Sequence, residues 1–172
     1  MEIIHKKKRE IELPLEIVVE NFLDLDHVNF VHKKCYSYCN ILRKSKNIML
    51  LDVGVKPLTP FPYTVHYTMF HEFISPNKIV HFSKQNGKKK YVKSIVEFNV
   101  EDGKTSIIHT HKIDIPFYLI PLKHIIIKLV DRWSNILWKE DSEIMKDRKK
   151  VVSKGFLDGP HCGKWLLING KP

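Results

Sequence analysis

Two histidines and two carboxylates lie close together in one apolar stretch near the start of the chain, NFLDLDHVNFVHKKC at residues 21–35. His27 and His32 are five residues apart, and five residues of an ideal helix turn the side-chain direction by about 140°. Both imidazoles can therefore reach one metal ion only if the helix ends, bulges or breaks between them, near Val28 or Asn29. Asp24 precedes His27 by three residues and shares its helix face, where it can accept a hydrogen bond from the ring nitrogen that faces away from a metal. The stretch predicts part of a metal site, and the alternative is a capped helix end with partly exposed histidines.

A third ligand must come from elsewhere, and a long predicted helix in the C-terminal part of the chain supplies a candidate. Asp141 falls in an apolar stripe that recurs at helical spacing. A carboxylate that faces a core normally has a partner or binds a metal. Glu140 points about 100° away, toward solvent. Asp141 is therefore the expected third ligand, and the alternative is a surface carboxylate paired with Lys139 or Arg148. The apolar stripe consists of Ile126, Val130, Trp133, Leu137 and Ile144.

Four other histidines fall in predicted strands, with His66 and His71 in one strand and His109 and His111 in another. A histidine in such a position is more often a hydrogen-bonded side chain of the sheet than a metal ligand. These four are interpreted as structural, although one of them can line a pocket.

The three cysteines are Cys35, Cys39 and Cys162. An odd number without a leader peptide ahead of it favours reduced thiols in the cytoplasm, and Cys35 and Cys39 are not expected to form a redox pair. The role of His161 and Cys162, which lie in a turn-rich segment, stays open. Neither a G-x-S-x-G motif nor a glycine-rich phosphate loop is present, so a serine nucleophile has no support.

The elements that must position these residues can be predicted from apolar spacing and turn signals. Residues 2–13 form an extended segment closed by Pro14, and a helix begins at Leu15. Residues 36–115 contain about six strands separated by turn signals such as NGKK and EDGK, and a helix follows over residues 122–154. An antiparallel sheet of this kind has an apolar face that the last helix can cover. This order of elements resembles the helix-grip fold of the START and Bet v 1-like superfamily. The resemblance implies an α+β fold with a curved sheet around a long helix and an internal apolar cavity.

Composition and charge limit the classes of function. With 172 residues, 43% hydrophobic and 28% charged, the chain is expected to form one globular domain, residues 1–172. The net charge of +10 favours an acidic partner, but the lysine clusters are not interleaved with aromatic residues, so nucleic-acid binding is not expected. The longest apolar run, residues 115–130, contains prolines, lysines and a histidine and is interpreted as a buried helix. A peripheral membrane contact there, and the oligomeric state, stay open.

The residues Asn21, Asp24, His27 and His32 form the pattern N-x-x-D-x-x-H-x-x-x-x-H. This pattern resembles the iron motif in the catalytic domain of Rieske-type non-haem iron oxygenases, most of all the vanillate demethylase and dicamba monooxygenase branch. WKEDSEIMKDR at residues 138–148 resembles the segment of that family's last helix whose aspartate is the third ligand. The resemblance implies that His27, His32 and Asp141 bind Fe(II), that Asp24 bridges to a histidine ligand, and that Asn21 is a polar neighbour in the pocket.

The chain departs from that family in two respects. The C-x-H and C-x-x-H pairs that hold a Rieske cluster are absent, so the chain resembles the catalytic domain without the cluster domain. The glutamine that follows the acidic pair in the family is also replaced. Electrons would then come from a separate ferredoxin-like or Rieske partner, or from the substrate itself. The basic surface would suit an acidic donor.

Three functions are consistent with these residues. The first expectation is a mononuclear non-haem iron protein of oxygenase type, in which two imidazoles and one carboxylate leave up to three positions for dioxygen and substrate. A hydrophobic or aromatic small molecule would occupy the cavity. The second is a START-like carrier of a hydrophobic ligand, with or without a structural metal. The third is a metal-assisted lyase or cyclase.

Overall fold

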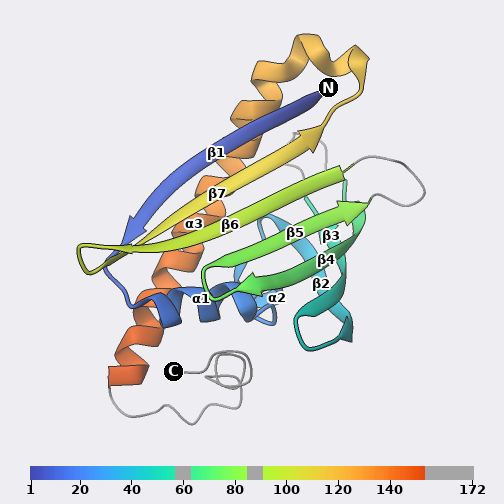
Figure 1. Ribbon diagram of the computed structural model, residues 1–172. Coiled ribbons are helices and arrows are strands. Elements are labelled where there is room, and N and C mark those ends of the chain that lie inside the picture. Colours follow the sequence, from blue (N-terminus) through green and yellow to red (C-terminus); the bar gives the residue numbers. More distant parts are fainter. Residues whose placement is uncertain (57–62, 85–90, 154–172) are drawn as a thin grey trace.

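The computed structural model of the chain describes residues 1–56, 63–84 and 91–153 (Figure 1). Seven antiparallel strands form one sheet in the order β1-β7-β6-β5-β4-β3-β2. The strands are β1 (Glu2–Ile11), β2 (Tyr36–Lys44), β3 (Ile48–Val55), β4 (Val65–Ser75), β5 (Lys78–Lys84), β6 (Tyr91–Glu101) and β7 (Lys104–Asp114). The helices are α1 (Leu15–Leu23), α2 (Val28–Val31), the 3-10 helix η1 (Phe117–Leu122) and α3 (Lys123–Ser153).

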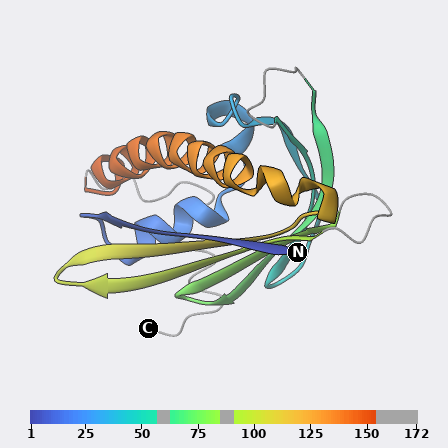
Figure 2. The same cartoon turned by 90° about the horizontal axis from the view of Figure 1, so that it is seen from above.

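The sheet curves around the long helix α3, and α1 and α2 lie on the same side of the sheet (Figure 2). Helix α3 contacts α1 and β1, while α1 also contacts β6 and α2 contacts β2. The N-terminal strand pairs with β7, so the extended segment expected at residues 2–13 forms one edge of the sheet. This arrangement confirms the predicted α+β helix-grip fold.

Local signals explain several of the boundaries. The turn between β6 and β7 places Asp102 (φ 51°) and Gly103 (φ 74°) in the left-handed region, as the predicted EDGK hairpin requires. Pro14 immediately precedes α1 and closes the extended segment. Apolar residues then follow one another at helical spacing, and α1 buries Ile17, Val18 and Val19 among other side chains.

Two groups of buried side chains make up most of the core among the described residues. One group joins α1 and α3 to β1 and to strands β4 to β7, and the other joins α2 to β2 and β3. The larger group contains Ile11, Leu13, Ile17, Val18, Val19, Leu23, Phe73, Ile79, Val96, Phe98, Ile107 and Met145. The smaller group contains Val28, Cys39, Met49, Leu51 and Val53.

The interpretation of residues 115–130 as a buried helix is wrong. Ile115 is buried, but residues 117–130 form η1 and the first turns of α3, and η1 has no buried residue. Phe117 and Tyr118 are 83% and 67% exposed, because this segment runs past the end of β7 rather than across the sheet. No helix among the described residues is both long and apolar enough to cross a membrane.

Candidate metal centre and its pocket

The two histidines of the opening stretch flank a single helical turn. Helix α1 ends at Leu23, and the extended backbone of Asp24 (φ −82°, ψ 92°) stops it. Helix α2 follows, with His27 at its N-cap and His32 at its C-cap. The break therefore lies before His27, and not near Val28 or Asn29 as expected. The backbone of His32 (φ −89°, ψ 36°) departs from the helical conformation, so the chain leaves α2 directly after this residue.

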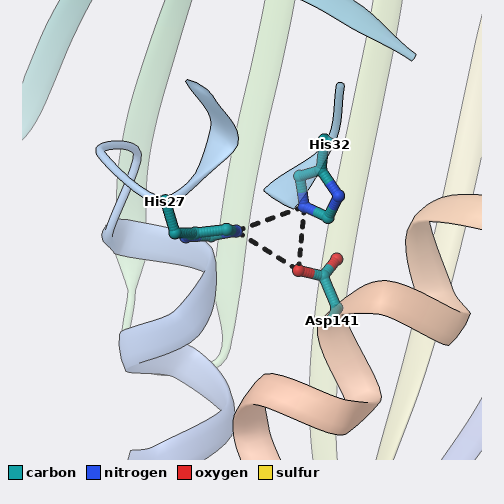
Figure 3. A group of neighbouring side chains, drawn as sticks. All are labelled: His27, His32 and Asp141. Carbon is teal, nitrogen blue, oxygen red and sulfur yellow. Dashed lines mark hydrogen bonds and ion pairs between the residues drawn. The ribbon is translucent and has the colours of Figure 1, made fainter. Parts of the chain in front are cut away.

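His27, His32 and Asp141 converge on one point, and the aspartate comes from the middle of α3 (Figure 3). Asp141 Oδ1 lies 3.3 Å from His27 Nε2 and 3.1 Å from His32 Nε2. The two Nε2 atoms lie 3.2 Å from each other. All three side chains are largely withdrawn from solvent, with side-chain exposures of 11%, 4% and 15% in that order. The structure thus brings together the three residues that the sequence singled out.

The three atoms have the separations that a first-row divalent metal ion requires. Ligand atoms that bind one ion at about 2.1 Å, with angles between roughly 90° and 109° at the ion, lie about 3.0–3.4 Å apart. The observed separations of 3.1–3.3 Å fall within that range. Two imidazole nitrogens and one carboxylate oxygen also form the donor set of the 2-His-1-carboxylate facial triad, which suits Fe(II). The residues therefore fit a metal ion.

Other side chains orient two of the three ligands. His32 Nδ1 lies 2.9 Å from Glu140 Oε2, which fixes the ring and leaves Nε2 facing the site. The Asn21 side-chain amide donates a hydrogen bond of 2.9 Å to Asp141 Oδ1. Asn21 is 1% exposed and lines the pocket, so it is a polar neighbour of the site as expected.

The structure corrects the expectations for two carboxylates. Asp24 Oδ2 is 3.9 Å from His27 Nδ1, too far for a hydrogen bond, and that carboxylate oxygen instead accepts a hydrogen bond from Arg148. His27 Nδ1 is buried without a hydrogen-bond partner among the described residues. Glu140, which was expected to point toward solvent, supports His32. Helical spacing within α3 does not reveal this contact, because His32 is at the C-cap of α2 and reaches Glu140 from beside α3.

The electrostatics of the three ligands favour a cation. Burial acts to raise the pKa of Asp141, but hydrogen bonds from His27, His32 and Asn21 outweigh it and hold that pKa well below its usual range. Burial acts to lower the pKa of His32, but the carboxylates of Asp141 and Glu140 raise it overall. The site therefore stabilises positive charge beside the imidazoles, whether that charge is a proton or a metal ion.

A cavity of about 170 Å³, partly open to solvent, adjoins the three residues and lies between the helices and the sheet. Its volume is close to the roughly 150 Å³ of a cavity that binds benzene, so it has room for one ring with small substituents. Most of its walls are apolar, which favours a hydrophobic ligand. The apolar side chains of the wall include Leu25, Val28, Leu51, Val53, Met69 and Ile107.

Several histidines of the sheet line the same cavity. His71, His109 and His111 line it, and with His66 they were expected to be hydrogen-bonded side chains of the sheet. The expectation holds for His66, which pairs with the Tyr38 hydroxyl, and for His109, which pairs with the Ser94 hydroxyl. Neither ring nitrogen of His71 has a hydrogen-bond partner among the described residues. His81, which the sequence did not single out, joins them. Burial lowers the pKa of His81 and of His111 to about 4. These side chains are therefore uncharged at neutral pH.

This burial predicts a dependence of stability on pH. Between about pH 6.5 and pH 4 the unfolded chain protonates His81 and His111, whereas the folded chain keeps them neutral. The unfolded state binds more protons, so the free energy of unfolding should fall as the pH is lowered, by on the order of 2 kcal/mol for each of the two residues. Urea unfolding at several pH values measures the fall. The double variant His81→Gln/His111→Gln should show a shallower dependence, and an unchanged slope would contradict the assignment.

The cysteines have the properties of structural thiols. Cys35 and Cys39 are buried and free. Burial raises the pKa of the Cys35 thiol to about 12 and that of Cys39 to about 11, so both stay protonated at neutral pH. His161 and Cys162 lie outside the described residues.

Comparisons with known proteins identify the fold but no family. No family model matches the chain, and no curated protein matches it. Among solved structures, the chain is similar to the Zhui aromatase/cyclase from Streptomyces sp. R1128, with 11% identity, coverage of 86% of this chain and 96% of that chain, and a TM-score of 0.71. It is also similar to a START superfamily protein from Mycobacterium smegmatis, with 12% identity, 84% and 97% coverage and a TM-score of 0.66. A point mutant of norcoclaurine synthase from Thalictrum flavum has 10% identity, 87% and 97% coverage and a TM-score of 0.66.

At such low identities the similarity establishes the fold alone. The similarity supports the predicted helix-grip fold of the START and Bet v 1-like type. It brings no evidence for the resemblance to Rieske oxygenases.

Proposed function

We propose that this protein binds a small hydrophobic molecule in its internal cavity, beside a divalent metal ion held by His27, His32 and Asp141, and that the metal is Fe(II) used for oxidation of that molecule. The observation that carries the proposal is the convergence of three ligand atoms, 3.1–3.3 Å apart, on the wall of a mainly apolar cavity. A metal ion bound by these three atoms would therefore lie next to a hydrophobic molecule bound in the cavity.

The proposed roles of the residues follow from their contacts. His27 and His32 would bind the metal through Nε2, and Asp141 through Oδ1. Glu140 holds the His32 ring by its Nδ1 atom, and the Asn21 amide orients the Asp141 carboxylate. When bound, Fe(II) in a site with three protein ligands would supply dioxygen activation. The apolar walls would hold the substrate and exclude water from it.

Electrons for such a reaction would come from outside this site. Only one group of three potential ligand atoms lies within 4.8 Å in residues 1–56, 63–84 and 91–153, and that group is His27, His32 and Asp141. The proposed source is the substrate itself or a separate protein. The net charge of +10 would favour an acidic donor such as a ferredoxin-like protein.

Analysis of protein purified without oxygen tests this proposal. We expect about one Fe(II) per chain after reconstitution, and an electron paramagnetic resonance signal when nitric oxide is added. Oxygen uptake that requires both a small aromatic compound and a reductant would support oxidation. Protein that takes up no first-row metal under any of these conditions would contradict the proposal.

A second candidate function is a carrier that holds a hydrophobic molecule in the same cavity without converting it. The similarity to a START superfamily protein supports this candidate. A hydrophobic compound that co-purifies with metal-free protein would favour it. Metal-dependent formation of a product without oxygen uptake would instead favour a lyase or cyclase, the class that the similarity to an aromatase/cyclase supports.

The contact between Glu140 and His32 gives a testable prediction. In Glu140→Gln the charge that orients and polarises the His32 ring is lost, so the affinity for Fe(II) should fall by about 10- to 100-fold. Competition with a metal chelator measures this affinity. Glu143→Gln, an exposed position on the same helix, is the matched control and should leave the affinity unchanged. Equal affinities in the two variants would exclude this role of Glu140.

A further inference from the structure

A row of polar side chains crosses the inner face of the sheet and lines a wall of the cavity. This wall is formed by the strands and is separate from the three proposed metal ligands. His71 of β4 is paired directly with His81 of β5, His81 with Ser94 of β6, and Ser94 with His111 of β7. Residues that are directly opposite in antiparallel strands point to the same face of the sheet. All four side chains line the cavity that His27, His32 and Asp141 adjoin. The name imidazole row is used below for His71, His81, Ser94 and His111.

The imidazole row contains buried polar atoms that the described protein residues leave unpaired. Both ring nitrogens of His71 and the Nε2 atoms of His81 and His111 lack a hydrogen-bond partner among the described residues. His71 is 1% exposed and His111 is 6% exposed. A buried polar group without a partner costs about 1–3 kcal/mol, so such groups are normally satisfied by protein, water or a ligand. The side chains of the imidazole row line the cavity, so a ligand bound there would lie beside them.

The chemistry of the row selects the kind of group that would bind. Burial lowers the pKa of His71 well below its usual value and those of His81 and His111 to about 4, so all three rings are neutral near pH 7. A neutral imidazole has one N–H donor and one nitrogen acceptor. Its N–H can donate to a hydroxyl or carbonyl oxygen, and its other nitrogen can accept a hydrogen bond from a hydroxyl group. Neutral rings carry no charge that would offset a buried carboxylate or phosphate.

Arg9 is the positively charged residue in the wall of the cavity. Its Nη2 atom donates to the Ser134 carbonyl oxygen and hydroxyl at 3.0 and 2.8 Å and to Asn135 Oδ1 at 3.2 Å. Its guanidinium also lies over the Trp138 ring, 5.4 Å from the ring centroid. A second metal site is not indicated, because the group of His27, His32 and Asp141 is the only one of its kind in the described part of the chain.

We propose that the imidazole row is a second subsite of the pocket, which hydrogen-bonds an uncharged oxygen of an otherwise apolar ligand. This inference rests on the proposed binding of a small hydrophobic molecule and narrows that molecule to a small phenol, alcohol or ketone. The ligand would place its oxygen on His71, His81 or His111 and its apolar part against the remaining walls. The row would thereby fix the orientation of the ligand relative to the metal ligands.

Calorimetric titration of phenol and toluene into the metal-free protein tests the subsite. The two probes have nearly the same shape and fit a cavity of about 170 Å³, and without metal the phenol oxygen cannot bind an ion. A purely apolar cavity prefers toluene, because a buried hydroxyl loses its hydrogen bonds to water. We expect the opposite preference, with phenol bound at least about ten-fold more tightly than toluene.

A pair of leucine variants locates the preference. His71→Leu removes two buried polar atoms with little change of volume and should lower phenol affinity by about ten-fold while leaving toluene affinity unchanged. His66→Leu, at an exposed position of the same strand, is the matched control and should retain the preference for phenol. If His71→Leu does not fold, spectra of wild-type protein with ¹⁵N-labelled histidine decide. Phenol, and not toluene, should then shift the ring resonances of the imidazole row.

The outcomes separate this inference from the proposed function. Equal affinities, or a preference for toluene, would overturn the subsite and leave the hydrophobic pocket intact. Binding of neither probe would overturn both. A phenol preference that survives in His71→Leu, without shifts of the row's resonances in wild-type protein, would also overturn the subsite.

Discussion

The Asp141→Ala variant, reconstituted with Fe(II) under anaerobic conditions, is expected to retain less than about one-tenth of the iron that the wild-type protein binds. Asp141 Oδ1 lies within 3.3 Å of both Nε2 atoms and is the sole anionic atom of the proposed donor set. Its removal leaves two neutral imidazoles, which cannot offset the charge of the ion. His27→Ala should have a similar effect, because it leaves one imidazole and one carboxylate.

Metal analysis after gel filtration measures this loss, and circular dichroism shows whether the fold is retained. Asp147→Ala is the matched control, since Asp147 is an exposed carboxylate on the same helix. It should bind iron like the wild-type protein. Full iron occupancy in both Asp141→Ala and His27→Ala would rule out the site.

The second large effect is expected when the cavity is filled from the sheet. Val53 lies on β3, is 1% exposed and lines the cavity. In Val53→Trp the indole would occupy much of the 170 Å³, so the affinity for a one-ring probe such as toluene should fall by more than about 100-fold. Iron binding should persist, because Val53 provides none of the three ligand atoms.

Calorimetry with toluene and metal analysis together test this separation. Leu50→Trp is the control on the same strand. Side chains alternate between the two faces of a strand, so residues 50 and 53 point to opposite faces of β3. This control should keep both toluene binding and iron binding. Undiminished toluene affinity in folded Val53→Trp protein would mean that the ligand binds elsewhere.

The ligand triad could be predicted from sequence because each of its parts leaves a local signal. Two histidines follow the first helix five residues apart, and Asp141 interrupts an apolar stripe. The fold could be predicted for a related reason. Alternating strands, turn signals and one long amphipathic helix permit few packed arrangements.

The surroundings of the triad could not be predicted, because they depend on contacts between distant segments. Asp24 pairs with Arg148, which lies 124 residues away, and so does not reach His27. Glu140 meets His32 because the chain after α2 passes beside α3, which helical spacing alone does not reveal.

The imidazole row was equally hidden. His71, His81 and His111 lie on three strands, and only the register of β4 to β7 brings them into line. Nor does sequence spacing show which of these rings find hydrogen-bond partners. Residues 115–130 were interpreted as a buried helix because they are mostly hydrophobic. Hydrophobicity alone does not show that η1 lies beyond the end of the sheet, where its side chains are exposed.

Anomalous X-ray diffraction at the iron edge, from crystals of Fe(II)-loaded protein grown without oxygen, would locate the metal ion. One strong peak is expected at about 2.1 Å from His27 Nε2, His32 Nε2 and Asp141 Oδ1, on the wall of the cavity. Iron bound at another position, or no iron at these three side chains in crystals soaked with excess Fe(II), would contradict the proposed metal site.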